Sequence, residues 1–229
     1  MKHDIVYILK NDIDDAELIY SIRSVCQNFP YNKIWFAGGM PEHIKPDEYM
    51  YINQDGHNKW EKVSYSLKKI CKNDEITEDF WLFNDDFFIM QPIDDFPAAV
   101  RGTMHHRIVG LKQKHQYSGY IGKLERTENL LRNRCYDTLD YALHVPMLIN
   151  RAKALETLKE FDLPMFRCLY GNHHKIGGVI MDDVKIYDLD KEPTGEEIML
   201  STTDKSFKNG KVGPYIRSQF PDKCKYEER

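Results

Sequence analysis

Two adjacent carboxylates interrupt a strongly apolar, aromatic stretch of the chain between Phe80 and Ile89. The residues on both sides of Asp85 and Asp86 are almost all apolar, which is typical of a buried strand. Two unpaired carboxylates at the end of such a strand are costly to bury and repel each other. A divalent cation resolves both problems, because oxygen ligands suit Mg²⁺ or Mn²⁺. The alternative is that the two aspartates only cap a turn after the strand.

Apolar runs alternate with helical patterns through the first half of the chain. The apolar runs predict strands over residues 5–9, 33–37, 49–52 and 80–83, and the helical spacing predicts helices over 15–29 and 58–71. This order predicts an α/β fold with a mostly parallel central sheet flanked by helices. Ligands of such sheets bind at the carboxyl ends of the strands. Polar segments follow three of these predicted strands, at residues 10–12, 38–39 and 84–86.

The second half of the chain is less regular. We expect a loop over the site at 97–122, helices at 124–134 and 151–161, an extended piece at 141–146 and a strand at 184–187. The polar tail from Ser201 predicts a mobile lid, in which Lys208, Lys211 and Arg217 would close over a diphosphate. The whole chain then forms one domain, with a nucleotide-binding half at 1–96, an acceptor and catalytic half at 97–200 and the tail at 201–229.

Charge and cysteine content exclude several classes of protein. The net charge is −4, so no basic excess indicates a nucleic-acid binder, although a basic groove beside the acidic pair would favour one. The five cysteines form no CxxC pair, which predicts reduced thiols and argues against a zinc site. The opening residues lack the apolar core of a signal peptide, and no apolar run is long enough to span a bilayer. We therefore expect a cytoplasmic protein.

Several short segments, scattered along the chain in a fixed order, resemble one known family. They are residues 17–25, 29–30 and 33–36, then Phe83-Asn84-Asp85-Asp86-Phe87-Phe88, His144-Val145-Pro146, residues 167–172 and residues 220–227. Together they resemble the Stealth family of sugar-phosphate transferases, which includes capsular polysaccharide phosphotransferases, and in particular its short stand-alone relatives. The chain departs from that family in its opening segment, where residues 7–12 replace a Trp-Val-Asp-Gly-like run, and in its shorter length.

The resemblance implies a glycosyltransferase-A-like domain that binds a nucleotide sugar. In that fold an acidic pair at a strand end holds the metal on a nucleotide diphosphate, so Asp85 and Asp86 would be the ligands of Mn²⁺ or Mg²⁺. Asn84 would orient these carboxylates. Asn11 and Asp12 would bind the nucleoside, or they would form an ordinary turn.

Basic residues and histidines supply the remaining candidates. Lys59 could contact phosphate or be a solvated surface lysine, and Arg23 could bind phosphate or pair with an acidic neighbour. His144 is the candidate general base, because histidine titrates near neutral pH. Arg167 would stabilise transferred charge through bidentate contacts. His173 is a candidate metal ligand, and because neighbours on a strand point to opposite faces, at most one of it and the adjacent histidine should bind.

The predicted function is metal-dependent transfer of a sugar from a nucleotide-diphosphate sugar to a hydroxyl of a glycan or another acceptor, with His144 or Asp86 as the base. Two alternatives keep the same fold, and the first of them also uses the same catalytic groups. One is transfer of a sugar phosphate with release of a nucleoside monophosphate, and the other is a non-catalytic module that binds nucleotide sugars. A hydroxylated nucleobase is a further possible acceptor, which the acidic composition disfavours.

Overall fold

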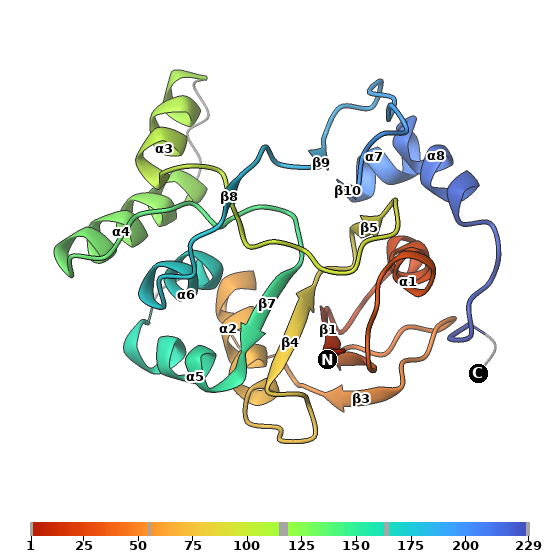
Figure 1. Ribbon diagram of the computed structural model, residues 1–229, viewed down its shortest axis with the longest axis horizontal. Helices are drawn as coiled ribbons and strands as arrows, with labels where there is room; N and C mark the ends of the chain where they lie inside the picture. The colour runs from red at the N-terminus through yellow and green to blue at the C-terminus, as the bar shows by residue number, and fades with distance from the viewer. Residues whose placement is uncertain (1, 55, 115–118, 163–164, 228–229) are drawn as a thin grey trace.

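A five-stranded sheet forms the centre of the computed structural model, which describes residues 2–54, 56–114, 119–162 and 165–227 (Figure 1). Its strands lie in the order β3-β2-β1-β4-β7, with bounds Glu48–Tyr51, Ile34–Gly38, Asp4–Leu9, Asp79–Phe83 and Met147–Asn150. The first four strands of this order are parallel, and β7 is antiparallel to β4. The predicted mixed α/β architecture with a mostly parallel sheet is confirmed.

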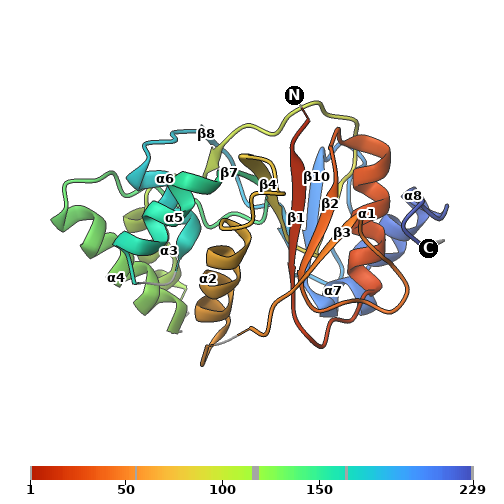
Figure 2. The ribbon, with the colours of Figure 1, turned by 90° about the horizontal axis from the view of Figure 1, so that it is seen from below.

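Helices α1 (Ala16–Asn28) and α2 (Lys59–Ile70) cover opposite faces of this sheet, as Figure 2 shows from the edge. Helix α1 buries Leu18, Ile22 and Val25, the helical-period residues, against β1 and β2. Helix α2 begins where the Asn58 side chain accepts hydrogen bonds from two backbone amides of its first turn. Both helices therefore form where the sequence predicts them.

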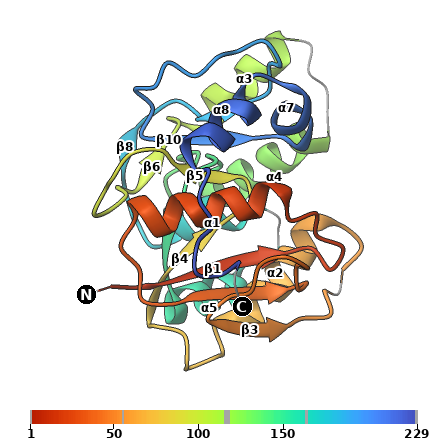
Figure 3. The same cartoon turned by 90° about the vertical axis from the view of Figure 1, so that its right-hand side faces the viewer.

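A second sheet, in the order β5-β10-β9, packs beside α1, and its strand β10 leads into the tail that was expected to be a lid. Its strands are Phe87–Ile89, Met199–Thr202 and Lys185–Ile186. The chain continues into α7 (Asp204–Asn209) and α8 (Val212–Gln219), which bury Phe207, Val212 and Ile216 in a third apolar cluster. Figure 3 shows α7 and α8 lying to one side of α1. These apolar side chains anchor the tail to the body of the protein, and its closure as a lid stays a prediction.

The predicted lid cations also make local contacts. Lys208 pairs with Asp14, and Lys211 pairs with Glu192 at 2.7 Å. Arg217 donates a hydrogen bond to the carbonyl of Phe207 at 3.4 Å.

The middle of the chain is mostly helical. Its elements are β6 (Ala99–Val100), α3 (Met104–Gln113), α4 (Gly119–Asn133), α5 (Arg151–Glu160), α6 (Phe166–His173) and β8 (Val179–Ile180). The prediction of a loop over 97–122 is wrong where α3 and the start of α4 form, and residues 115–118 lie outside the described residues. Helix α3 begins where the Thr103 side chain accepts a hydrogen bond from the amide of His106. The extended piece at 141–146 forms no strand of its own, and the strand β7 follows it. Helix α5 matches its prediction.

The connections place the polar ends of β1, β2 and β4 along one edge of the main sheet. From β1 the chain moves outward to β2 and β3, and then returns to β4 on the other side of β1. Loops after β1 and β4 therefore diverge at this switch point, which is where open α/β sheets bind ligands. The loop after β2 approaches so closely that a Cβ on Gly39 would lie 2.1 Å from the carbonyl of Lys10. In the part of the chain that the structure describes, no helix combines the length and apolar character needed to cross a membrane.

Candidate active site

Asp85 and Asp86 form the turn between β4 and β5, at the switch point of the main sheet. The amide of Phe87 donates to the carbonyl of Asn84 at 3.3 Å, so the turn expected from the local sequence is present. The Asp86 side chain is buried, and its Oδ2 accepts hydrogen bonds from Lys185 Nζ at 2.6 Å and Ser201 Oγ at 3.1 Å. Its Oδ1 is also buried, yet it has no hydrogen-bond partner among the described residues. A turn cap alone would not leave this oxygen unpaired.

Two further carboxylates, from Glu17 in α1 and Asp204 in α7, crowd the same corner. Burial, and then the charges of Asp86 and Asp85, raise the pKa of Glu17 to about 7, although the hydrogen bond that Thr202 donates to it acts in the opposite direction. Burial and the charge of Asp86 raise the pKa of Asp85 to about 6. Both pKa values therefore rise because these carboxylates are buried close to other negative charge.

These residues fit a divalent cation that a substrate helps to bind. Within the described residues, the carboxylates at this corner do not supply three ligand atoms close enough to surround an ion by themselves. Mg²⁺ is commonly held by one or two carboxylates together with substrate phosphates. Asp85 and the free Oδ1 of Asp86 meet that requirement, while Lys185 occupies the other oxygen of Asp86.

A cavity of about 790 Å³ lies next to this corner, and Asn84, directly before Asp85, is part of its wall. Among the described residues, its charged lining is predominantly basic and includes Lys59, Arg101, Arg107, Lys114 and Arg167, with one opposing carboxylate, Asp183. Aromatic rings of Trp60, Tyr120 and Tyr187 complete the wall. Buried guanidinium nitrogens of Arg101, Arg107 and Arg167 have no hydrogen-bond partner among the described residues. Such donors suit the oxygens of a phosphate-bearing ligand.

His144 lines the cavity and is held by Asp183. The ring Nδ1 lies 2.9 Å from Asp183 Oδ2, and the His144 backbone amide donates to Asp183 Oδ1 at 3.0 Å. Arg101 also contacts Asp183 at 2.5 Å. Burial raises the pKa of Asp183, but the hydrogen bonds and charge of His144 and the charge of Arg101 outweigh it and hold the pKa at about 2. An ionised Asp183 fixes the imidazole and leaves Nε2 without a partner in the described structure, free to accept a proton.

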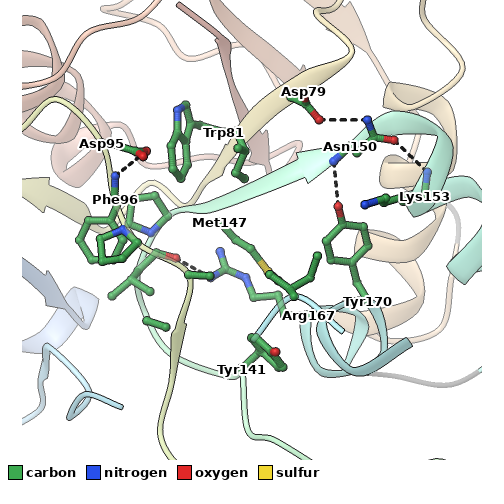
Figure 4. A pocket seen from close by; sticks show the side chains of 17 residues that line it. Asp79, Trp81, Asp95, Phe96, Tyr141, Met147, Asn150, Lys153, Arg167 and Tyr170 are labelled. Carbon is green, nitrogen blue, oxygen red and sulfur yellow. Dashed lines mark hydrogen bonds between the residues drawn. The ribbon is translucent and has the colours of Figure 1, made fainter. Parts of the chain in front are cut away.

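Arg167 lines the large cavity and is close enough to the acidic corner to be influenced by the charge of Asp86. Its NH1 donates to the carbonyls of Leu143 and Val145, and NH2 is buried without a described partner. Burial lowers the pKa of Arg167 to about 10, opposed by the charge of Asp86, so the guanidinium stays charged at neutral pH. Figure 4 shows the same side chain entering a second, smaller cavity of about 310 Å³ between β7 and α6. Because Arg167 lines the larger cavity as well, it is placed to contact charge on a ligand there.

The remaining predicted site residues are only partly brought together. Lys59 lines the large cavity and lies over the Trp60 ring. Asn11 and Asp12 are exposed in the loop after β1. Arg23 forms an ion pair with Glu227 at 2.6 Å, the structural alternative that the sequence left open. Figure 3 shows this C-terminal segment crossing α1.

His173 does not join the acidic pair. It lies at the end of helix α6, not on a strand, and its ring contacts Tyr136, Phe161 and Glu156. The sequence predicted that His173 and His174 point to opposite faces of a strand. This is wrong, because the two residues lie at the end of a helix and the centroids of their rings are 4.5 Å apart. The structure thus separates His173 from the site to which the sequence assigned it.

Sequence reasoning missed Glu17, Asp183 and Lys185. Glu17 carried a usable signal, because it stands in the first turn of the helix that follows the first strand. Lys185 pairs with Asp86 across 99 positions of sequence, and no local pattern marks such a partner. Neither a scan against models of known protein families nor a search of curated proteins finds a match for this chain.

Proposed function

We propose that this protein is a metal-dependent glycosyltransferase with a glycosyltransferase-A-like fold that moves a sugar from a nucleotide-diphosphate sugar to an acceptor hydroxyl. The observation that carries the proposal is a basic cavity of about 790 Å³ next to a crowded carboxylate pair, of which Asp86 is buried. A chain with net charge −4 gathers guanidinium and ammonium groups in this cavity, and three of the guanidinium nitrogens have no hydrogen-bond partner within the part of the chain that the structure describes. That arrangement favours a ligand with several anionic oxygens.

The basic side chains would bind the diphosphate of the donor. Arg107 and Arg167 offer unpartnered buried nitrogens, and Lys59 and Lys114 add point charges at the wall. Asp85 and Oδ1 of Asp86 would hold Mn²⁺ or Mg²⁺ on the same phosphates. The cation would supply neutralisation of the charge that develops on the leaving diphosphate.

His144 is the proposed general base. Asp183 accepts a hydrogen bond from Nδ1, which orients the ring and supports the positive charge that follows proton uptake at Nε2. The acceptor hydroxyl would lose its proton to Nε2 as its oxygen attacks the anomeric carbon of the sugar. Arg167 would then stabilise the negative charge that moves to the departing phosphate.

Sugar-phosphate transfer is the second candidate, and the placement of Arg167 favours it. A guanidinium with a free NH2, close to the imidazole of His144 along the same cavity wall, also suits charge on a phosphorus under attack. The basic lining likewise keeps a hydroxylated nucleobase among the acceptors to be tested, because it is the groove beside the acidic pair that such an acceptor would require.

The released nucleotide distinguishes these reactions. Purified protein is incubated with Mn²⁺ and a panel of uridine, guanosine, adenosine and cytidine nucleotide sugars, with glycans, hydroxymethylated DNA or water as acceptor. Chromatography then separates nucleoside diphosphates from monophosphates. A diphosphate product supports glycosyl transfer, and a monophosphate product overturns it in favour of the second candidate.

Matched variants test the roles of the residues. Asp85→Asn and His144→Gln should each lower kcat by about 10²-fold or more. Exposed Asp222→Asn and His3→Gln, at the amino end of β1, should leave kcat unchanged. Donor binding without turnover by the wild-type protein would instead identify a non-catalytic binding module.

A further inference from the structure

Two imidazoles and a carboxylate converge where the end of α6 meets α5. One ligand atom from each of Glu156, His173 and His174 lies within 4.8 Å of the other two, the only such group found among the described residues. His173 Nε2 is 3.4 Å from Glu156 Oε1. Neither the proposed transfer reaction nor the carboxylate corner uses these side chains.

Hydrogen bonds fix which nitrogen of His174 carries the proton. Its Nε2 lies 2.9 Å from the carbonyl of Lys153 and 2.9 Å from Thr157 Oγ1. The carbonyl can only accept, and the Thr157 hydroxyl already donates its hydrogen to that same carbonyl at 3.0 Å. Nε2 must therefore donate to both oxygens, which leaves the lone pair of the neutral ring on Nδ1.

His173 is oriented in a similar way. Its Nδ1 lies 3.0 Å from the hydroxyl of Tyr136, which leaves Nε2 directed toward Glu156. Tyr136 and Phe161 pack edge-on against the ring, with centroids 5.3 and 5.2 Å away. Rings of metal-binding histidines are held in this manner, by a hydrogen bond at the nitrogen that does not bind the metal.

We propose that His173 Nε2, His174 Nδ1 and the Glu156 carboxylate bind one zinc ion. Two neutral imidazoles and one carboxylate are a common zinc ligand set, with water as the fourth ligand. The cysteines, whose spacing argued against zinc, take no part in this site. The ion would link α5 to the C-terminal end of α6, while Arg167 lies in the first turn at the other end of that helix. Zinc would thereby stabilise the helix that presents Arg167 to the large cavity.

Zinc binding by the full chain tests this proposal. Protein stripped with EDTA is titrated with ZnCl₂ against a chromophoric chelator, and Co²⁺ is added separately to record its visible spectrum. We expect one equivalent of zinc, the bands of tetrahedral Co²⁺, and a thermal midpoint raised by roughly 5 °C at zinc 100-fold above Kd.

Glu156→Gln is the decisive variant, because this side chain is largely exposed and its replacement leaves the fold intact. It should weaken zinc binding at least about tenfold, and His174→Ala should do the same. Glu160→Gln, one turn further along α5 in an ion pair with Arg134, is the matched control and should bind as tightly as wild type. Cys135→Ser should also bind normally, which excludes the exposed thiol as the ligand.

Two results would overturn the proposal. Wild-type protein that binds no zinc would show that Glu156 and His173 form only an ordinary ion pair. Zinc binding that survives unchanged in both Glu156→Gln and His174→Ala would place the ion elsewhere. Asp85→Asn should retain the zinc, so failure of the proposed catalytic metal and failure of this site give different results.

Discussion

Replacing Glu17 by glutamine should stabilise the protein, and the gain should depend on pH. Glu17 is 7% exposed and its carboxylate accepts a hydrogen bond from Thr202, which a glutamine carbonyl can also accept. The variant therefore keeps the shape and the hydrogen bond but removes a charge from the crowded corner. Its effect isolates the electrostatic cost of ionising this group.

The magnitude follows from the pKa of Glu17, which burial and the neighbouring Asp86 and Asp85 raise from 4.5 to about 7. Because the folded pKa lies above the unfolded value, ionisation costs nothing well below pH 4.5, costs more as pH rises from 4.5 to 7, and reaches its full value above 7. At about 1.4 kcal/mol per pKa unit the full cost is about 3.5 kcal/mol as an upper bound, against about 1 kcal/mol at pH 5. Since the neighbouring carboxylates titrate together with Glu17, we expect about 2 kcal/mol of additional stabilisation of the variant at pH 8.5 relative to pH 5.

Urea denaturation followed by circular dichroism measures this difference. With a denaturant slope of about 2–3 kcal/mol/M, the midpoint of Glu17→Gln should exceed that of wild type by roughly 1 M at pH 8.5, and by much less at pH 5. Exposed Glu42→Gln is the control and should show no such pH-dependent difference. If the Glu17 variant has the same advantage at both pH values, or none, the crowded carboxylates do not carry the charge inferred here.

Other changes give separable outcomes. Asp183→Asn should destabilise the protein by about 2 kcal/mol at pH 7, because the pKa of Asp183 is held at about 2. Stability that comes from a depressed pKa is lost as the pH falls. Urea midpoints should therefore show the difference in stability between variant and wild type shrinking by about half at pH 3. The same variant should lower kcat more than it raises KM if Asp183 orients His144. Gly171→Ala should lower the free energy of unfolding by about 1–3 kcal/mol in the same assay, because a Cβ there would lie 2.5 Å from the Tyr141 ring. Gly122→Ala has open space around the new Cβ and should stabilise α4 by up to about 1 kcal/mol. Binding of inorganic pyrophosphate, measured by calorimetry, should weaken steeply with added NaCl, and salt-independent binding would argue against the basic cavity as its site.

The elements of the first half were predictable because each has a strong local pattern. Helix α1 repeats Leu18, Ile22 and Val25 at helical spacing, and β4 is a short apolar run between polar segments. The carboxylate pair was predictable for the same reason, since charge at the end of a buried run is a local anomaly. The segments after residue 97 lacked such patterns, and α3 in particular has a weakly amphipathic sequence.

The tail and the site partners were not predictable in the same way. Residues after 201 are mostly polar and include five lysines, so composition gives little weight to the apolar side chains that anchor them, such as Phe207 and Ile216. Asp183 and Lys185 become site residues only because the second sheet brings them to β4. Their roles depend on long-range packing, which local periodicity does not encode.

The distribution of unpaired groups is the strongest physical reason to expect a ligand between the carboxylates and the cavity. Oδ1 of Asp86 and NH2 of Arg167 carry opposite charge, are both buried, and influence each other electrostatically, yet neither has a hydrogen-bond partner in the described structure. Folding for stability alone would pair such atoms, because each buried polar atom without a hydrogen bond is costly. A substrate that presents anionic oxygens to the guanidinium and shares a cation with the carboxylate would satisfy both at once. If the bound complex leaves both atoms unpaired, this explanation of the site is wrong even where catalysis is observed.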